Sequence, residues 1–481
     1  MSRTCWMCST ATRLRKEGDR SMVFSSPIFL FAFLPALLLV YFFARKELRN
    51  WILVAASLFF YAFGEPRTVF LMLLSILVNY VVGLLIEKYS RHKKLILTLA
   101  VLYNLAVLFV FKYLNFTVNT FNTIFGTNVA VAKIALPIGI SFYTFQIMSY
   151  VIDVYRGKCG TQKSLLSLAL YVSLFPQLIA GPIVRYVDIE KQIRERESTT
   201  NGLYEGFLRF GLGFAKKVLI ADQLAPLVEK VFAGGYTSVP LHWIGAIAYA
   251  LQIFYDFSGY SDMAIGLGKI FGFSFAENFD YPYISQSIRE FWRRWHISLS
   301  TWFRDYLYIP LGGNRKGNGR TYLNLLIVFL ATGLWHGASF NFLVWGLYHG
   351  LFLILERVGF GKILDRFPRW VRHLYTILIV VIGWVFFRAD NLTAAVAYIG
   401  RMFVPGGNDL VQMSYVMDPQ YWFCLCAGIL FSMPVFRKLL RPDHPKAAGR
   451  TMYPVCVILL FVLAVCFMVG SGYSPFLYFR F

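Results

Sequence analysis

Long apolar runs without a charged side chain recur from one end of the chain to the other. Each is near the roughly 17–25 residues that an α-helix needs to cross a bilayer. Apolar and polar positions do not alternate within the runs, which argues against a transmembrane β-barrel. Helices remain as the way to satisfy every backbone hydrogen bond in hydrocarbon. The clearest runs are 28–44, 68–86, 95–111, 134–152, 164–184 and 452–479.

Two regions are too irregular for a single straight helix. Leu174–Arg185, LFPQLIAGPIVR, carries two prolines and a glycine at membrane depth, and Thr321–Leu355 is too long for one span and holds His336 and His349. Broken or re-entrant helices are tolerated at that depth only where protein or a cavity surrounds them. We therefore expect an all-α polytopic membrane protein of about eleven membrane segments, some of them re-entrant, with the functional site in the middle of the chain.

The stretch Tyr249–Arg320 mixes charges and aromatic rings in a different way. YDFSGYSDMAIGLGK sets Asp256 and Asp262 in an apolar, glycine-rich sequence, and FWRRWHISLSTWFRDYLYIPLGGNR sets tryptophan and tyrosine beside arginine. Such neighbours are typical of a membrane interface. We expect short amphipathic or re-entrant helices here that enter from the cytoplasmic side, with Gly312–Arg320 as a flexible basic loop at that face.

Composition and charge agree with a membrane protein and give it an orientation. The chain is 57% hydrophobic and only 15% charged, against about 25% charged in a soluble domain. A net charge of +22 would suggest nucleic-acid binding in a soluble protein, but here the basic residues lie in loops between spans. The positive-inside rule makes those loops cytoplasmic, and the charge-poor loops Gly64–Arg67 and Lys112–Lys133 place Met22 outside. The basic loops contain Arg45, Lys46, Arg49, Lys88, Arg91, Lys93, Lys94, Arg156 and Lys158.

The first 21 residues conflict with this orientation, because their five basic residues would have to cross the membrane. They lack the apolar core and cleavage site of a signal peptide. Cys5 and Cys8 form a CxxC, but no second pair completes a zinc site, so we expect no metal centre. We expect residues 1–21 to be an extension outside the native fold and residues 22–481 to form a single membrane domain.

Two of the seven histidines are candidates for chemistry. His336 lies in LATGLWHGASFNFLVWG, a long uncharged stretch, and an ionisable side chain within a membrane segment is a functional candidate by default. His296 lies in FWRRWHISLS, beside cations that disfavour its charged form if it is buried. Neutral imidazole suits general-base work on a hydroxyl or thiol. The alternative for both is a structural, hydrogen-bonded histidine. We expect solvated surface for His92, His373 and His444, and an interfacial role for His242.

The remaining polar residues of the middle stretch are expected to position the site. Asp256 and Asp262 are six residues apart, so they do not share a helix face closely and are unlike a carboxylate dyad. We expect each to pair with an arginine such as Arg293 or Arg304, and Asp305 to belong to the same set. The chain contains no HExxH, GxSxG, Walker A or dinucleotide-binding glycine pattern, so nucleotide hydrolysis and metal catalysis lack support.

These motifs resemble the membrane-bound O-acyltransferase family, and within it the bacterial branch that O-acetylates alginate. The resemblance runs from MVFSSPIFLFAFLP at Met22 to SPFLYFRF at the C-terminus. Several long motifs stand in the same order, which makes chance similarity improbable. The motifs are LPIGISFYTFQ, FPQLIAGPIVR, YDFSGYSDMAIG, FWRRWHISLSTWFRDYLYIPLGGNR and GLWHGASFNFLVWG.

The resemblance implies a ring of tilted helices around a cytoplasmic funnel, with the catalytic histidine of the WHGA motif, His336, at its base and His296 as the second histidine. It implies an O-acetyltransferase of the bacterial inner membrane that takes acetyl groups from cytoplasmic acetyl-CoA. The acceptor would be an extracytoplasmic polysaccharide, usually reached through a partner of the SGNH-hydrolase type. The basic residues Arg315, Lys316 and Arg320 could receive the CoA phosphates.

Three other functions stay open at this point. A relative that transfers D-alanyl groups from a carrier protein would use the same chemistry. A polysaccharide or lipid transporter could use the broken helices as a path, although the repeated halves typical of transporters are absent. A scaffold without catalysis would make His336 dispensable for everything except stability.

Overall fold

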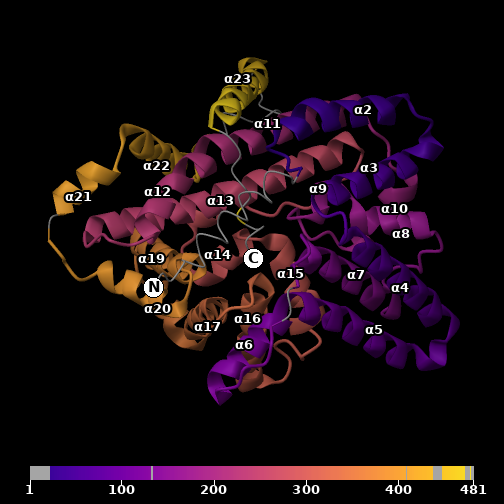
Figure 1. Cartoon of the computed structure of the whole chain (residues 1–481), viewed down its shortest axis with the longest axis horizontal. Helices are drawn as coiled ribbons and strands as arrows, with labels where there is room; N and C mark the ends of the chain where they lie inside the picture. Colours follow the sequence, from indigo (N-terminus) through magenta and orange to yellow (C-terminus); the bar gives the residue numbers. More distant parts are fainter. Residues whose placement is uncertain (1–21, 132–133, 408, 437–446, 472–476, 478–481) are drawn as a thin grey trace.

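The computed structural model describes residues 22–131, 134–407, 409–436, 447–471 and 477. Every regular element within these ranges is a helix, which confirms the all-α prediction. The predicted extension, residues 1–21 with Cys5 and Cys8, and His444 all lie outside the described residues. In Figure 1, the short helices α14 and α15 lie near the centre, and longer helices surround them.

The N-terminal part is a group of helices on one side of the molecule (Figure 1). Helices α4 and α5 both pack against α7, and α3 packs against α8. The elements are η1 (Phe29–Phe33), α2 (Leu34–Phe43), α3 (Arg49–Gly64), α4 (Val69–Lys88), α5 (Lys93–Leu108), η4 (Phe109–Tyr113), α6 (Leu114–Phe125), α7 (Ile140–Tyr155), α8 (Leu165–Ser173), α9 (Phe175–Leu178) and α10 (Tyr186–Glu195).

The middle part contains α13, a helix of 32 residues that lies along α11 across the molecule (Figure 1). Helix α14 contacts both α17 and α19, so the short central helices rest on the long ones. The elements are α11 (Thr200–Lys216), η5 (Lys217–Ala221), α12 (Asp222–Phe232), α13 (Val239–Ile270), η6 (Pro282–Ile284), α14 (Ile288–Arg294), α15 (Ile297–Phe303), η7 (Arg304–Tyr308), α16 (Gly317–His336) and α17 (Phe340–Leu355).

The C-terminal part covers the opposite side, with α19 packed on α17 and α23 packed on α11. Its elements are η8 (Glu356–Phe360), α18 (Gly361–Leu364), α19 (Arg369–Arg388), α20 (Leu392–Arg401), α21 (Asp409–Val416), α22 (Pro419–Phe431), η9 (Pro434–Phe436) and α23 (Ala447–Ser471).

Five helices among the described residues are long and apolar enough to cross a membrane. Phe29–Phe43 and Pro419–Phe431 are shorter apolar helices of the kind that re-entrant segments require. The count of about eleven membrane segments and the cytoplasmic funnel stay predictions. The five long candidates are Val69–Lys88, Ser90–Phe125, Phe340–Leu364, Arg369–Arg388 and Met452–Gly470.

Both irregular regions break as predicted. Thr321–Leu355 is divided at Gly337–Ser339, between α16 and α17. Leu174–Arg185 contains the single turn of α9 and then non-helical backbone before α10. In Leu174–Arg185, Pro176 and Pro182 each remove a backbone donor and disfavour a continuous helix. Thr321–Leu355 contains no proline, and its helix ends where Gly337 adopts an extended backbone.

Three expectations about local structure were wrong. The stretch from Tyr249 is not a set of short helices up to Ile270, because it completes the 32-residue α13. Lys112 does not open a loop, since α5, η4 and α6 follow one another without a break from Lys93 to Phe125. The predicted basic loop is also shorter than expected, because α16 begins at Gly317 and includes Arg320. In each case the local sequence permits helix, and packing against neighbouring helices extends it.

Basic loops meet at one end of the helices. Lys163 pairs with Glu87 at 3.8 Å, and Arg156 Nη1 donates to the carbonyl oxygen of Asp305 at 3.1 Å. We call this end the basic face, and the positive-inside rule assigns it to the cytoplasm. It is formed by residues 45–49, 87–94, 156–163, 185–198 and 304–316.

The loops that are poor in charge meet at the other end, which we call the opposite face. Tyr61 Oη donates to the carbonyl oxygen of Ile138 at 3.0 Å. Met22, Glu65 and Ile138 line one small cavity there. The structure therefore brings together segments that the charge pattern had placed on a single side of the membrane.

Candidate active site

His336 is the last residue of α16, at the point where the chain turns into α17. The two helices pack tightly, because Gly333 and Gly346 leave room for the backbone of the facing helix. Ser339 caps α17 by accepting from Asn341 N–H at 3.2 Å. This break fixes the direction in which the His336 side chain leaves the helix.

The imidazole of His336 is buried within aromatic rings. Its centroid lies 5.0 Å from that of Trp335, 5.1 Å from Trp345 and 5.1 Å from Phe387, with nearly perpendicular planes. Only 3% of the residue is exposed. Water is therefore largely excluded from the ring, which strengthens electrostatic interactions with a reacting group.

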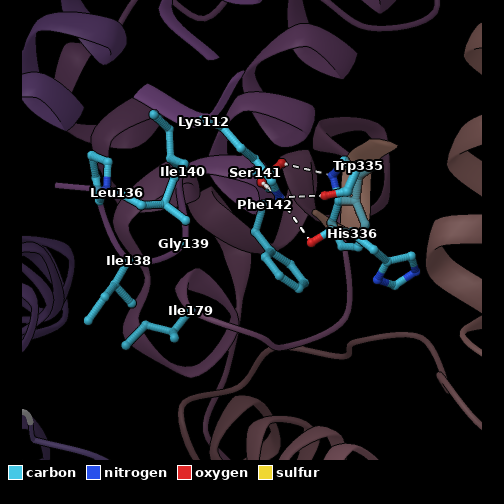
Figure 2. A pocket seen from close by; sticks show the side chains of 11 residues that line it. Lys112, Leu136, Ile138, Gly139, Ile140, Ser141, Phe142, Ile179, Trp335 and His336 are labelled. Carbon is cyan, nitrogen blue, oxygen red and sulfur yellow. Dashed lines mark hydrogen bonds between the residues drawn. The ribbon is translucent and has the colours of Figure 1, made fainter. Parts of the chain in front are cut away.

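Lys112 holds the end of α16 from the opposite face. Its ammonium donates to Ser141 Oγ at 3.0 Å, to the carbonyl oxygen of Trp335 at 2.5 Å and to that of His336 at 3.3 Å (Figure 2). Tyr113 adds a hydrogen bond to the carbonyl oxygen of Leu334 at 2.7 Å. The last carbonyls of a helix have no partner within the helix, and a cation there also complements the helix dipole.

A pocket of about 70 Å³ reaches His336 on this side. It is bounded by Lys112, by the segment that leads into α7 and by the end of α16 (Figure 2). The lining residues are Lys112, Leu136, Pro137, Ile138, Gly139, Ile140, Ser141, Phe142, Ile179, Trp335 and His336. The pocket therefore brings an apolar wall and a few polar groups, among them the Lys112 ammonium and the Ser141 hydroxyl, to the end of α16.

His296 lies next to this group, at the junction of α14 and α15. It is fully buried and has a left-handed backbone with φ of 44°. Its ring centroid lies 5.9 Å from that of Trp335 and 4.7 Å from that of Phe257. Both predicted histidines thus contact the indole of Trp335. A non-glycine residue with positive φ is strained, and such residues cluster at functional sites.

The predicted partners Arg293 and Arg304 were wrong for both aspartates, although Asp262 does pair with an arginine. Asp256 pairs with Lys217 at 2.8 Å, and Asp262 pairs with Arg209 at 2.6 Å and with Lys216 at 2.6 Å. These cations come from α11 and η5, which the length of α13 brings beside both aspartates. These ion pairs hold α11 and η5 against α13, so the structure gives both aspartates a positioning role.

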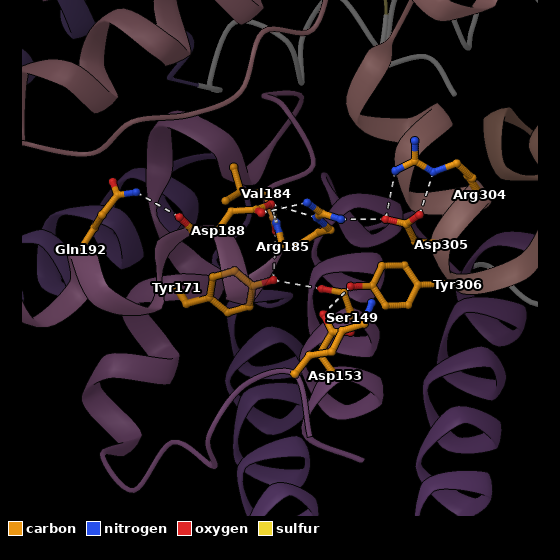
Figure 3. Close-up of polar contacts among 11 residues, drawn as sticks. Ser149, Asp153, Tyr171, Val184, Arg185, Asp188, Gln192, Arg304, Asp305 and Tyr306 are labelled. Atoms are coloured by element: carbon orange, nitrogen blue, oxygen red, sulfur yellow. Dashed lines mark hydrogen bonds and ion pairs between the residues drawn. The ribbon is translucent and has the colours of Figure 1, made fainter. Parts of the chain in front are cut away.

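Arginines of the interfacial stretch lie elsewhere. Arg293 is exposed. Arg304 pairs with its neighbour Asp305 at 2.8 Å, and Asp305 also pairs with Arg185 at 2.8 Å (Figure 3). Burial alone would raise the pKa of Asp305, but the hydrogen bond from Arg304 and the positive charges of Arg304 and Arg185 outweigh it and lower that pKa. This cluster joins η7 to the start of α10 at the basic face.

Arg315, Lys316 and Arg320 are exposed around the start of α16. His336 ends the same helix, and 20 helical residues rise about 30 Å. The three cations therefore lie at the basic face and are not neighbours of the histidine. They could bind only a part of a ligand that is remote from the reacting group.

The exposure of the other described histidines agrees with prediction for His92 and not for His373. His92 is exposed, as predicted. His373 is half-buried with its Nδ1 3.2 Å from the carbonyl oxygen of Ser285, so its assignment to solvated surface was wrong. His242 is buried in the first turn of α13, where Nδ1 lies 2.7 Å from the carbonyl oxygen of Ser238.

The sequence profile of the MBOAT, membrane-bound O-acyltransferase family, matches residues 56–394. The chain belongs to this family. The match spans every element that contributes to the pocket, from η4 to α16. This membrane-bound O-acyltransferase is therefore a multi-pass membrane enzyme that transfers acyl groups.

Relatives of this membrane-bound O-acyltransferase act on different polymers, according to their names. A probable alginate O-acetylase of Pseudomonas putida is 44% identical over 96% of this chain and 100% of its own length. A peptidoglycan O-acetyltransferase of Helicobacter pylori is 34% identical over 96% of this chain and 98% of its own. A teichoic acid D-alanyltransferase of Bacillus subtilis is 29% identical over 52% of this chain and 66% of its own.

Sequence reasoning missed two residues that contact the site of this O-acyltransferase. Lys112 carried a usable signal, since a lone cation within a long apolar helix is a functional candidate, but it was assigned to a loop. Asn278 contacts His296 Nδ1 at 3.1 Å, and no pattern in the sequence pointed to it. It precedes His296 by 18 residues in irregular backbone, and only the folded chain shows that the two meet.

Proposed function

We propose that this protein is an O-acetyltransferase of the bacterial inner membrane that takes acetyl groups from cytoplasmic acetyl-CoA. The acceptor is an extracytoplasmic polysaccharide, reached through a partner of the SGNH-hydrolase type. Two long relatives named as an alginate O-acetylase and a peptidoglycan O-acetyltransferase support an acetyl group and a polymer acceptor. Both relatives match nearly the whole chain, whereas the D-alanyltransferases match about half of it.

The single observation that carries this proposal is the position of the two buried histidines. Both contact Trp335 inside an aromatic chamber, and His336 lines a pocket. In the proposed reaction His336 accepts the proton of the acceptor hydroxyl as its oxygen attacks the acetyl carbonyl. The carbon–sulfur bond breaks, and the imidazolium returns that proton to the CoA thiolate. A histidine can do this because its neutral form is a base near physiological pH.

The pocket and the basic residues lie at two ends of α16, which suits a reaction that joins two sides of a membrane. Arg315, Lys316 and Arg320 make no ion pair with a carboxylate among the described residues. Free guanidinium and ammonium groups bind phosphates well. We assign them to the phosphates of CoA at the basic face, with the acetyl group extended towards His336.

The donor can be tested with the purified protein in sealed vesicles. We expect [1-¹⁴C]acetyl-CoA supplied to the basic face to lose its label to the protein, its partner or the polymer, with release of free CoA thiol. A D-alanyl carrier protein supplied in the same way should give no transfer. Transfer of D-alanine in place of acetyl would contradict the proposed donor, although the chain would still be an acyltransferase.

A further inference from the structure

Asn278 gathers hydrogen-bond donors from three successive residues around His296. Its side-chain Oδ1 lies 3.1 Å from His296 Nδ1 and accepts from Ser298 N–H at 3.3 Å and from Ser298 Oγ at 2.9 Å. Its backbone carbonyl accepts from Ile297 N–H at 2.9 Å. Asn278 therefore accepts hydrogen bonds from the two backbone N–H groups that follow His296. These bonds stabilise the positive φ of His296.

The same contacts decide which way the Asn278 amide points. A backbone N–H can only donate, so the amide atom that faces Ser298 N–H must be the oxygen. The amide nitrogen then points the other way, where it donates to Ser261 Oγ at 3.1 Å. Ser261 belongs to α13, so the long helix fixes the orientation of Asn278.

The orientation of the amide decides the tautomer of His296. Ser298 Oγ also lies 3.5 Å from His296 Nδ1, but its single proton is donated to Asn278 Oδ1 at 2.9 Å. The Asn278 oxygen, 3.1 Å from Nδ1, can only accept, so Nδ1 carries the proton. A neutral imidazole carries one proton, so Nε2 keeps its lone pair. Nε2 has no hydrogen-bond partner among the described residues. Nε2 is thus a buried hydrogen-bond acceptor beside Trp335, and no donor among the described residues reaches it.

We propose that Asn278 is a positioning residue that holds His296 in the Nδ1–H tautomer and leaves Nε2 as a buried acceptor beside Trp335, next to His336. Its ligand there is a donor group of the substrate: a hydroxyl, a thiol or an amide N–H. The tautomer follows from the contacts alone, while its use in acyl transfer rests on the function proposed above. Catalytic and metal-binding histidines are held in one tautomer in the same way, by a neighbouring group that hydrogen-bonds to the other ring nitrogen.

The tautomer itself is measured without any assay of activity. The full chain, labelled with ¹⁵N in its histidine rings and placed in lipid vesicles, gives a spectrum in which protonated and unprotonated ring nitrogens are distinct. Subtracting the spectrum of His296→Gln isolates His296. We expect a protonated Nδ1 and an unprotonated Nε2 at neutral pH. The reverse pattern, or two protonated nitrogens, overturns the proposal.

Variants then connect the tautomer to the reaction. Asn278→Leu removes the acceptor, and we expect kcat for acetyl transfer to fall at least tenfold with KM for the donor changed less than twofold. Asn278→Asp keeps an oxygen at the same place and should restore most of kcat and the Nδ1–H signal. A loss in Asn278→Asp as large as that in Asn278→Leu, with the Nδ1–H signal kept, overturns the positioning role.

These outcomes separate the inference from the proposed function. If the ¹⁵N spectrum shows the Nδ1–H tautomer but the wild-type protein transfers no acetyl group, the proposed donor fails and the assignment of Asn278 to the His296 tautomer stands. If acetyl transfer proceeds and His296 carries its proton on Nε2, the proposed function stands and the inference is overturned. Asn278→Leu also removes the hydrogen bond between the side-chain oxygen and the backbone N–H of Ser298, so this variant could fail to fold. In that case the wild-type spectrum and Asn278→Asp test the proposal.

Discussion

At the scale of single residues, the site depends on contacts that hold each histidine in one place. Lys112 is the clearest example, because all three ammonium N–H groups have acceptors, two of which are carbonyls at the end of α16. A lysine with every donor engaged holds structure and is not free to bind a substrate anion. Its contribution to activity therefore passes through the position of His336.

Lys112→Met tests this assignment, since methionine keeps most of the side-chain volume and removes the three donors. Hydrogen bonds that involve a charged group are worth roughly 1.5–3 kcal/mol each, and tenfold in rate corresponds to about 1.4 kcal/mol. We expect acetyl transfer to fall by about tenfold or more, together with a lower midpoint of thermal unfolding in detergent. Lys94 is exposed and provides the control Lys94→Met. This control should change neither the acetyl transfer rate nor the midpoint of thermal unfolding. Full activity in Lys112→Met would show that Lys112 is not needed to position His336.

At the scale of elements, α11 and α13 form the pair on which the middle of the molecule is built. A Cβ added at Gly213 would lie 2.5 Å from the carbonyl oxygen of Gly259, and one at Gly266 would lie 2.6 Å from that of Gly206. The two backbones therefore touch, which only small residues allow. This packing explains the glycines of the YDFSGYSDMAIG motif, and it fixes Ser261, the partner of Asn278.

Buried ion pairs complete this pairing. Lys217 is almost fully buried and lies 2.6 Å from Asp222 and 2.8 Å from Asp256. Asp256 also accepts from the backbone N–H of Leu477 at 2.8 Å, so the C-terminal part of the chain is tied to the same group. Removing one member of a buried pair leaves an uncompensated charge, which costs about 3–5 kcal/mol.

We therefore expect Lys217→Met to lower the thermal unfolding midpoint strongly and to reduce the amount of protein in the membrane. Lys217→Met leaves two unpaired carboxylates, and the double variant Lys217→Met with Asp256→Asn removes the more deeply buried one, so it should recover more than half of that loss. Circular dichroism during heating, in one detergent and at one pH, measures both variants. If the double variant were less stable than Lys217→Met alone, the loss would not come from an unpaired Asp256.

At the scale of the whole molecule, the loops meet at two faces and the site lies between them. The rule that basic loops stay in the cytoplasm predicts which face is which. Single cysteines at Ser90 and Gly319 should react with an impermeant maleimide only from the cytoplasm, and one at Asn119 only from outside. All three positions are exposed, and the seven native cysteines must be replaced first. The reversed labelling pattern would contradict both the orientation and a cytoplasmic donor.

Much of this arrangement could be predicted from the sequence, because the signals were strong and local. Uncharged runs predicted helices, prolines and the length of Thr321–Leu355 predicted the breaks, and a histidine in an apolar run predicted His336. Partners of the buried charges could not be predicted, since Lys217 and Asp256 meet only after α11 packs on α13. The contact of Asn278 with His296 could not be predicted for the same reason. Lys112 is different, because a lone cation within a long apolar run was a usable signal that was assigned to a loop.

The most direct test of the central claim compares two histidines that contact the same tryptophan. His336 lies 5.1 Å and His349 5.3 Å from Trp345, between ring centroids, and neither nitrogen of His349 has a hydrogen-bond partner among the described residues. Replacing either with phenylalanine keeps an aromatic ring in the packed core and removes the base. The measurement is the acetyl content of the cell's polysaccharide, or acetyl transfer in vesicles, at equal amounts of protein in the membrane.

We expect His336→Phe to abolish acetyl transfer while its thermal unfolding midpoint stays close to that of the wild type. His349→Phe should retain most of the transfer, because its ring contributes packing and no proton chemistry. Wild-type acetyl transfer in a folded His336→Phe protein would contradict the account, since the proton transfer assigned to His336 would then be carried out by another group.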